Sequence, residues 1–322
     1  MKSDSKRDAL NTINRRQWLS TSAAAALGGI IGTSQPAARA ETESGASGFR
    51  FCLNTGTIRG HKQPIDREVE IAAQAGYQAI EPWMDNLQRY LQSGGSLKDL
   101  RQRLDDGGLT VEGAIGFISW AVDDDSQRAK AFEQAKKDMD TLAQLGARRM
   151  AAPPAGLQQR METERIAERY HQLLELGDRT GVTPILEFWG KHPAIGKLCT
   201  AVSIAVESGH PKACVLADVF HMYRGGSPFE GLRLLSAQAM PVLHMNDFPA
   251  NPPRDQANDG HRVFPGDGVG PLPEILRLCL AGGARPVLSL ELFNQEYYKQ
   301  DVMEVAKTGL RKLKAVAAKA LA

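Results

Sequence analysis

The segments PILEFWG (184–190), VLADVFH (215–221), PVLHMND (241–247) and VLSLELFN (287–294) decide the fold. Each is a short apolar run that leads to one acidic or histidine residue: Glu187, Asp218, His244 and Glu291. These residues are 31, 26 and 47 positions apart, and the first two intervals are about the length of one strand–helix repeat. In a barrel of parallel strands, residues that follow successive strands converge at one end, where active sites lie.

The sequence before these four segments, from residue 49 onward, predicts strands that alternate with helices. We predict strands at 50–54, 77–81, 109–116 and 148–154, and helices at 65–76, 96–108, 126–146 and 161–181. Together with the four segments above, this gives eight strands that alternate with helices. The simplest fold for such a pattern is a single (β/α)8 TIM barrel over 49–322. Residues 246–270 are turn-rich and far longer than a usual strand–helix loop, so we expect them to fold over the mouth of the barrel.

The first 40 residues read as a targeting segment. Arg15 and Arg16 precede a short stretch rich in Ala and Gly, and an A-x-A signature ends at Ala40. This order predicts a twin-arginine signal peptide at 1–40, followed by a flexible mature N-terminus at 41–48. The expected location is periplasmic or extracellular, with the twin-arginine translocase as a partner during export. The apolar stretch is too short for a stable membrane anchor.

The charge of the mature chain argues against nucleic acid as a partner. The formal net charge of all 322 residues is +2, but residues 1–40 hold six basic and two acidic residues, which leaves the remainder near −2. A body of this charge has no broad attraction for a phosphate backbone. The four cysteines, Cys52, Cys199, Cys214 and Cys279, lack ligand-like spacing, and we predict that they are buried as small hydrophobic residues.

The residue types at the four strand ends suit a metal. A lone carboxylate after a strand is often only a helix N-cap or a loop residue, but four such residues in succession disfavour that explanation. Two Glu, one Asp and one neutral imidazole form an oxygen-rich set. Such a set favours one divalent metal, Mn²⁺ first, with Mg²⁺, Co²⁺ or Zn²⁺ as alternatives.

Five motifs give the chain a resemblance to a known family. The motifs are ILEFWG (185–190), LADVFHMYRGG (216–226), LHMND (243–247), DGHRVFPGDG (259–268) and SLELFN (289–294). They are similar to the xylose isomerase-like TIM-barrel superfamily, in its branch of sugar isomerases, epimerases and inosose-processing enzymes. The resemblance implies one metal bound by Glu187, Asp218, His244 and Glu291, with the two Glu also serving as acid and base. It further implies that His221 contacts a substrate oxygen, and that Arg262 binds substrate or orients a Glu.

The implied chemistry is proton transfer next to a carbonyl. Moving a carbonyl, or inverting a carbon beside it, requires removal of an α proton, and a Lewis-acidic metal stabilises the enediolate. Glu187 and Glu291 come from strands five and eight and could flank that carbon to take and return the proton. Trp189 could stack on a sugar face, and Glu81 could contact substrate, although a helix-cap role for Glu81 is equally compatible. Without a phosphate cradle, we expect an unphosphorylated sugar, keto-sugar or cyclitol.

Three other functions remain open from the sequence. A dehydratase or lyase of inosose or keto-sugar type would use the same metal and base. An abasic-site endonuclease shares the superfamily, and Asp259 and His261 match its D-x-H pair, but the two histidines expected after the second and third strands are missing. A non-catalytic sugar-binding barrel would not need two opposed Glu. Whether the chain forms a homo-oligomer, and whether Asp259 and His261 hold a second metal, is left open.

Overall fold

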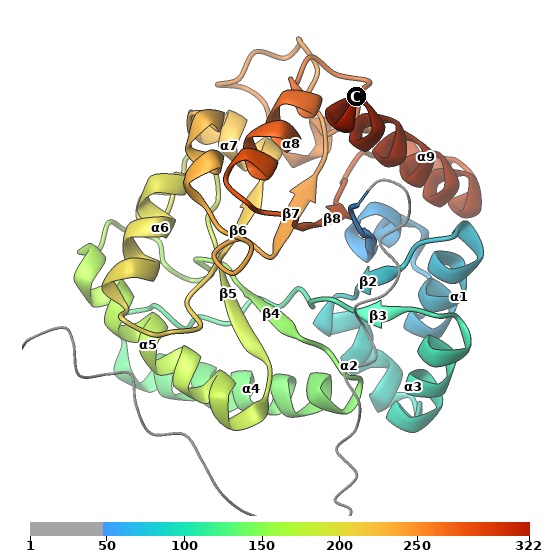
Figure 1. The fold of residues 1–322 in the computed structure, drawn as a ribbon. Coiled ribbons are helices and arrows are strands. Elements are labelled where there is room, and N and C mark those ends of the chain that lie inside the picture. Colours follow the sequence, from blue (N-terminus) through green and yellow to red (C-terminus); the bar gives the residue numbers. More distant parts are fainter. Residues whose placement is uncertain (1–47) are drawn as a thin grey trace, which may run out of the picture. The chain divides into compact units, whose positions relative to one another are not determined.

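Eight parallel strands occupy the centre of the computed structural model, which describes residues 48–322 (Figure 1). The predicted signal peptide and residues 41–47 lie outside the described residues. The strands are β1 Phe51–Asn54, β2 Ala79–Glu81, β3 Thr110–Val111, β4 Arg149–Ala152, β5 Thr183–Glu187, β6 Val215–Asp218, β7 Val242–Met245 and β8 Val287–Leu290. Their order in the sheet is β3-β2-β1-β8-β7-β6-β5-β4, as in a TIM barrel.

The two edges of this curled sheet, β3 and β4, approach each other. The backbone N–H of Ala151 donates to the carbonyl of Ala114, at 2.9 Å. The buried carboxylate of Glu112 also forms ion pairs with Arg50, which precedes β1, and with Arg149 on β4. These contacts tie β1, β3 and β4 together, and the (β/α)8 TIM-barrel prediction is confirmed.

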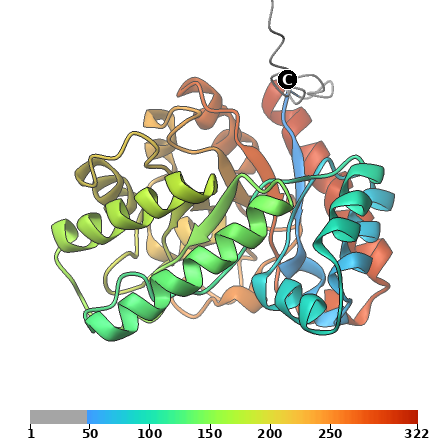
Figure 2. The ribbon, with the colours of Figure 1, turned by 90° about the horizontal axis from the view of Figure 1, so that it is seen from below.

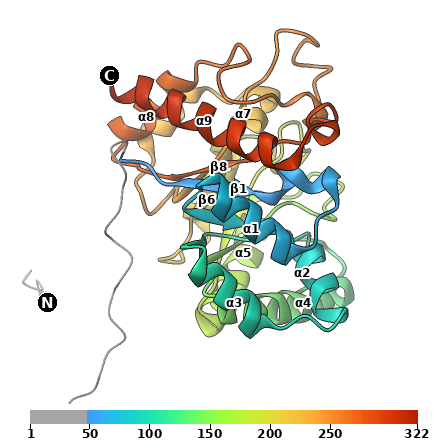
Figure 3. The same cartoon turned by 90° about the vertical axis from the view of Figure 1, so that its right-hand side faces the viewer.

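Helices surround the strands within the described residues. The α-helices are α1 Ile65–Ala75, α2 Met84–Gln92, α3 Leu97–Asp106, α4 Asp125–Gln144, α5 Thr163–Thr180, α6 Leu198–Glu207, α7 Val219–Gly225, α8 Leu272–Ala281 and α9 Val302–Leu321. Short 3-10 helices are η1 Thr55–His61, η2 Phe229–Leu234, η3 Asp259–His261 and η4 Tyr297–Lys299. Helices α4 and α5 pack side by side (Figure 2), and α9 lies along α1 and β1 (Figure 3). No helix between residue 48 and the C-terminus has the length and apolar character needed to cross a bilayer.

The predicted helices at 65–76, 96–108, 126–146 and 161–181 agree with α1, α3, α4 and α5 to within about two residues at each end. The predicted strand at 109–116 is shorter in the structure, because regular pairing ends at Val111 and resumes only as a bridge between Ile115 and Trp83. Between them, a Cβ on Gly113 would lie 2.5 Å from Oε1 of Glu81. Glycine at this position therefore leaves room for the side chain of Glu81.

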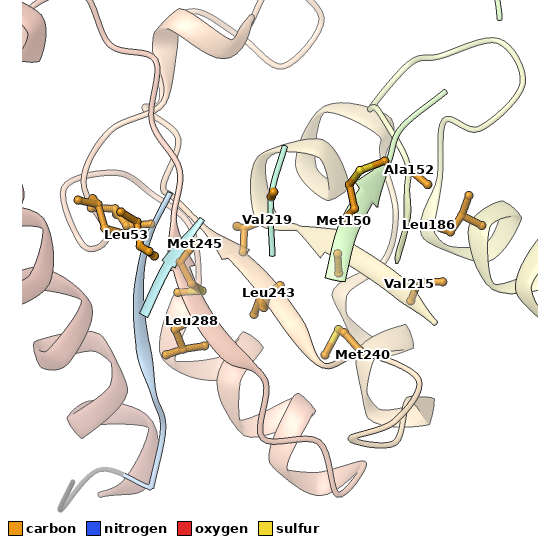
Figure 4. Close-up of a cluster of buried hydrophobic side chains, with 14 of the residues drawn as sticks. Leu53, Met150, Ala152, Leu186, Val215, Val219, Met240, Leu243, Met245 and Leu288 are labelled. Carbon is orange, nitrogen blue, oxygen red and sulfur yellow. The ribbon is translucent and has the colours of Figure 1, made fainter. Parts of the chain in front are cut away.

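Alternation along the strands separates two apolar layers. Inward positions such as Ile185, Leu216, Val242 and Val287 form a cluster inside the barrel. Outward positions such as Leu186, Leu243 and Leu288 belong to the larger core between strands and helices, part of which is shown in Figure 4. The side-chain period of two therefore fixes which strand residues can reach the interior of the barrel.

The cysteine prediction is correct for three residues and wrong for one. Cys52, Cys214 and Cys279 are buried free thiols, whereas Cys199 is free and exposed. Cys199 lies on α6, whose buried face is formed by Leu198, Ala201 and Ile204. The helical period places position 199 on the opposite side of this helix, away from the core.

The long connection at 246–270 is irregular, as predicted, and Asp247 holds it in place. Residues 259–261 form its short 3-10 helix. The two carboxylate oxygens of Asp247 accept hydrogen bonds from the backbone N–H groups of Phe248, Gly266, Gly268 and Gly270, at 2.8 to 3.1 Å. A Cβ on Gly268 would lie 2.4 Å from Oδ1 of Asp247, so glycine permits this close approach.

We predict that Asp247→Asn destabilises the protein. The amide keeps the shape but offers one acceptor oxygen, so two of these N–H groups would face an NH₂ group and lose their bonds. The free energy of unfolding should fall by about 2 kcal/mol or more, the scale of losing hydrogen bonds to a buried charge. Chemical denaturation measures this, and Asp255→Asn, at an exposed position of the same loop, should change stability by less than about 0.5 kcal/mol. Equal stabilities of the two variants would contradict this account of the loop.

Candidate metal centre and active site

The four predicted ligand residues share one position relative to the barrel. Glu187, Asp218 and His244 lie two residues after the inward-facing Ile185, Leu216 and Val242, and Glu291 follows Ser289 on β8 in the same way. The pleat therefore directs all four side chains inward at the carboxyl ends of β5 to β8. All four are buried, with exposures of 5% or less.

Three of the four side chains form a group that could hold a metal ion. The potential ligand atoms of Asp218, His244 and Glu291 all lie within 4.8 Å of one another. Nδ1 of His244 is 3.2 Å from Oε2 of Glu291 and 3.8 Å from Oδ2 of Asp218. Glu187 lies outside this tight group, but it lines the same cavity as Glu291.

His244 has carboxylates on both sides of its ring. Although burial lowers its pKa, the charges of Glu291 and Glu81 raise the pKa of His244 well above its usual value, so a metal would bind Nδ1 in exchange for a proton. Nε2 lies 3.1 Å from Oε2 of Glu81, and the hydroxyl of Ser289 donates to the same oxygen. Because a carboxylate only accepts, this contact assigns the proton to Nε2. Nδ1 is buried and has no hydrogen-bond partner, and it faces two carboxylates. A histidine held by a carboxylate in this way is typical of metal ligands, so these residues fit a divalent metal.

Glu81 therefore has a contact that sequence reasoning did not foresee. The sequence analysis gave it a substrate contact or a helix-cap role, and in the structure it is 3% exposed and contacts His244 and Ser289. Burial raises its pKa, but the charge and hydrogen bond of His244 and the Ser289 bond outweigh burial and hold the pKa of Glu81 below its usual range. The structure thus places Glu81 behind the possible metal ligand His244, on the side away from Asp218.

Asp218 serves as a helix cap and as a member of the cluster at once. Its Oδ1 accepts the backbone N–H of His221 at 2.8 Å and so caps α7. Its Oδ2 accepts from Asn246 at 3.0 Å and from Arg262 at 2.7 Å. The N-cap function and a ligand function therefore use different oxygens of one carboxylate.

Arg262 is the buried cation at the barrel end. It is 1% exposed, and its Nη1 lies 2.7 Å from Oδ2 of Asp218 and 2.9 Å from Oε2 of Glu291. Its Nη2 donates to Oδ1 of Asp259 at 2.7 Å. Although burial lowers the pKa of Arg262, the charges of Asp218 and Asp259 raise it above its ordinary value, so the guanidinium keeps its charge. The predicted contact of Arg262 with a Glu is present in the structure.

Asn54 is a site residue that the sequence analysis missed. Its Oδ1 accepts from the backbone of Gly56 at 2.9 Å and from Nε1 of Trp83 at 3.0 Å, and its Nδ2 donates to Oε1 of Glu291 at 3.0 Å. The two donors facing Oδ1 fix the orientation of the amide. Asn54 ends β1, so the rule that selected the four ligand candidates, a polar residue at a strand end, could also have found it.

A cavity of about 350 Å³ opens onto this cluster. Its lining combines acidic, basic and aromatic side chains from most of the barrel loops. The lining residues are Trp83, Ile115, Phe117, Glu187, Trp189, His221, Arg224, Asp259, Arg262, Glu291 and Phe293. Trp120, by contrast, is fully buried beside Tyr170 and donates to the carbonyl of Pro153, so it belongs to the core.

The two glutamates of the cavity have different environments. Burial, followed by the charge of Glu291, raises the pKa of Glu187 to about 8. Glu291 accepts hydrogen bonds from Nδ2 of Asn54 at 3.0 Å and from Nη1 of Arg262 at 2.9 Å. Near neutral pH, and before any cation binds, the environment of Glu187 favours a proton on that residue.

His221 and His261, both considered in the sequence analysis, lie in different places. His221 lines the cavity, and its Nε2 is 3.3 Å from Nη2 of Arg262. Burial lowers its pKa, which favours the neutral ring. His261 directs Nδ1 to the backbone N–H of Asn258, within its own loop. Among residues 48–322, the group with metal-site geometry consists of Asp218, His244 and Glu291, without Asp259 or His261.

We predict that Glu81→Gln weakens metal binding without abolishing it. The amide can no longer accept from both His244 and Ser289 as a charged partner, so the His244 ring loses its fixed orientation. The dissociation constant for Mn²⁺ should rise about 10- to 100-fold. Titration calorimetry measures it, with His244→Ala as a variant that should lose most of the binding and His171→Ala, on α5, as the control. Unchanged affinity in the Glu81 variant would show that its contact does not support a ligand.

Comparison with known proteins finds relatives and a solved structure that are similar over most of this chain. An inosose isomerase of Bacillus velezensis is 27% identical over 278 residues, which cover 84% of this chain and 98% of the relative. A 3-dehydroshikimate dehydratase of Pseudomonas putida is 24% identical over 255 residues, covering 77% of this chain but 39% of that protein. A crystal structure of the protein IolI with a bound zinc atom is similar with a TM-score of 0.78 and 25% identity, over 84% of this chain and 99% of the other.

The family assignment rests on a match to most of the chain. The family model described as xylose isomerase-like TIM barrel matches residues 69–316, which include all four strand-end residues and the long loop. The chain therefore belongs to the xylose isomerase-like TIM barrel family.

Proposed function

We propose that this protein is a divalent-metal-dependent isomerase or epimerase that acts on a sugar, keto-sugar or cyclitol. The observation that carries the proposal is the convergence of Asp218, His244 and Glu291 within 4.8 Å, beside a cavity that Glu187 also lines. The relatives named inosose isomerase support a polyhydroxylated cyclic ketone or a sugar as the class of substrate. The cavity of about 350 Å³ has the size of a small-molecule site.

The metal would be held by Glu187, Asp218, His244 and Glu291. We favour Mn²⁺ because three of the four ligands are carboxylates. When bound, the metal supplies Lewis-acid polarisation of a substrate carbonyl. Nδ1 of His244, which is buried without a hydrogen-bond partner, supports its assignment as a ligand.

Proton transfer is assigned to the two glutamates. Glu291, whose two carboxylate oxygens accept hydrogen bonds from Asn54 and Arg262, is assigned as the group that removes the α proton. Glu187, which lines the same cavity, returns a proton to the neighbouring carbon or to the opposite face of the same carbon. The enediolate formed between the two steps is the shared intermediate of isomerases and epimerases.

Substrate would be oriented by His221, Arg262 and Trp189. All three line the cavity. Arg262 is held on two sides by Asp218 and Asp259, so its position is fixed before substrate binds. The aromatic face of Trp189 suits the C–H face of a sugar ring. The contacts of Glu81 support a role as a positioning residue for His244 in place of a substrate contact.

A dehydratase or lyase is the alternative function. The Pseudomonas putida relative named 3-dehydroshikimate dehydratase favours it. Removal of the α proton by Glu291 would be the same, and Glu187 would protonate a leaving hydroxyl on the next carbon. The two functions differ in whether Glu187 delivers its proton to carbon or to the hydroxyl of the next carbon, which then leaves as water.

We predict that Glu187→Gln and Glu291→Gln each lower turnover by at least about 10²-fold, because each removes one acid–base group while keeping its shape. Candidate keto-sugars and inososes are incubated with the metal-loaded protein in D₂O, and deuterium at the α carbon is measured by NMR. An epimerase with two bases should still exchange deuterium into one epimer in each variant. Glu207→Gln, at an exposed position of α6, serves as the control. Full activity in either site variant would remove that Glu from the mechanism.

We also propose export by the twin-arginine route, as the sequence indicates. Replacing Arg15 and Arg16 by Lys should leave the precursor in the cytoplasm, and the exported wild-type protein should begin at Glu41. Cell fractionation and N-terminal sequencing measure the two outcomes. Arg7→Lys, outside the pair, should be exported normally. Export of the double-Lys variant at the wild-type level would refute the assignment.

A further inference from the structure

A second cavity of about 830 Å³ lies beside the active site, between η1 and α2. Its lining includes Glu68 from α1, Arg59 and Lys62, and Trp83 and Tyr90 near and on α2. Trp83 also lines the cavity at the metal centre, so its side chain forms a wall common to both. The two cavities are therefore neighbours at the same end of the barrel.

Glu68 is the unusual group in this second cavity. It is 2% exposed, and its Oε2 is buried without a hydrogen-bond partner. Burial raises the pKa of Glu68 to about 7, although Asn86 and Thr55 oppose the shift. A buried carboxyl group without a full set of partners lowers stability, and such groups are concentrated at functional sites. Glu68 takes no part in the chemistry proposed for the metal centre.

The charged residues around the second cavity disfavour both cationic and anionic ligands. Arg59, Lys62 and Arg89 line it, which disfavours a cationic ligand. Two of these cations are already paired, because Asp85 binds both Arg59 and Arg89. The carboxyl of Glu68 in turn disfavours an anion in the depth of the cavity. A neutral ligand whose groups both donate and accept hydrogen bonds satisfies all of these conditions.

The other lining residues of this cavity suit a ligand that carries hydroxyl groups on a ring. Gln63, Gln92 and Ser93 offer side-chain donors and acceptors, while Trp83 and Tyr90 offer aromatic surface. Arg59 lies over the ring of Trp83, with Cζ 4.2 Å from its centroid. Aromatic faces together with amide and carboxyl groups are the combination that binds a sugar ring, whose C–H faces stack while its hydroxyls donate and accept.

We propose that this cavity binds a sugar unit, with Glu68 accepting a hydrogen bond from one of its hydroxyls. The favoured source is a second glycosyl unit of the substrate, which extends past Trp83 from the unit at the metal centre; the other source is a separate free sugar. The extended-substrate reading rests on the proposed function, whereas sugar binding in this cavity does not. The substrate is then a glycoside or disaccharide derivative larger than one ring.

Titration calorimetry of the Mn²⁺-loaded protein with cellobiose, maltose, trehalose and sucrose, and with glucose and fructose, tests the proposal. If the site takes a glycosyl unit, at least one disaccharide binds once per chain and about 10-fold more tightly than its component sugars. If the site takes a separate sugar, glucose or fructose binds twice per chain and no disaccharide has an advantage. Either result supports a sugar site, and a single weak event without a disaccharide advantage overturns it.

Variants locate the binding in the second cavity. Glu68→Gln keeps the shape of the side chain but replaces one of its two oxygens by an NH₂ group that cannot accept a hydrogen bond, so the affinity for the best-binding sugar should fall about 10-fold or more. Tyr90→Leu, which removes the aromatic face, should weaken it as well, and melting curves check that both variants fold. Asp66→Asn, on the same helix but outside the lining, should bind like wild type. Wild-type affinity in both cavity variants would overturn the assignment.

The same measurements separate this proposal from the proposed function. Glu187→Gln alters the metal centre and leaves the second cavity intact, so sugar binding that depends on Glu68 should persist in it. If no substrate exchanges solvent deuterium but this binding persists, the proposed reaction is wrong and the sugar site is right. If exchange occurs and Glu68 has no influence on binding, the reaction stands and the second site is refuted.

Discussion

The barrel end depends on the repulsion between carboxylates that are brought together out of contact with water. Glu187, Asp218 and Glu291 converge there because β-strand alternation directs them all inward. Like charges at such short range interact strongly in a medium of low polarity. Arg262 offsets part of this repulsion by pairing with Asp218 and Glu291. A divalent cation at the same place would offset the rest, which is the physical reason to expect one.

Arg262 comes from an irregular loop, so the charge balance of the site depends on that loop being ordered. Asp247 orders it by accepting four backbone N–H groups, three of them from glycines. Those glycines let the backbone approach the carboxylate closely. One buried carboxylate thus positions the loop, and the loop delivers the cation that stabilises the other carboxylates. This dependence explains why a stretch without regular structure can form part of a rigid site.

The sequence was sufficient to predict the strand ends, because each ligand candidate follows an apolar run. The alternation of side chains along a strand depends only on neighbouring residues, so it can be read from the sequence. It was insufficient for contacts that depend on register between distant strands. Glu81 is 163 positions from His244, and only the packing of β2 against the interior reveals that they meet. Asn54 meets Glu291 across 237 positions. Cys199 is exposed because of the side of α6 on which it lies. The apolar residues next to it in the sequence do not determine that side.

Glu187 and Glu291 have different surroundings, and this difference bears most directly on the proposed proton transfer. Asn54 fixes one oxygen of Glu291, and Oδ1 of Asn54 is itself fixed by Trp83. Trp83 is also the wall between the two cavities. A ligand that touches Trp83 in either cavity therefore contacts the residue that orients Asn54, which in turn binds Glu291. Two hydrogen bonds connect Trp83 to Glu291, so in the proposed reaction the part of the proposed substrate remote from the reacting carbon would influence proton transfer through positioning.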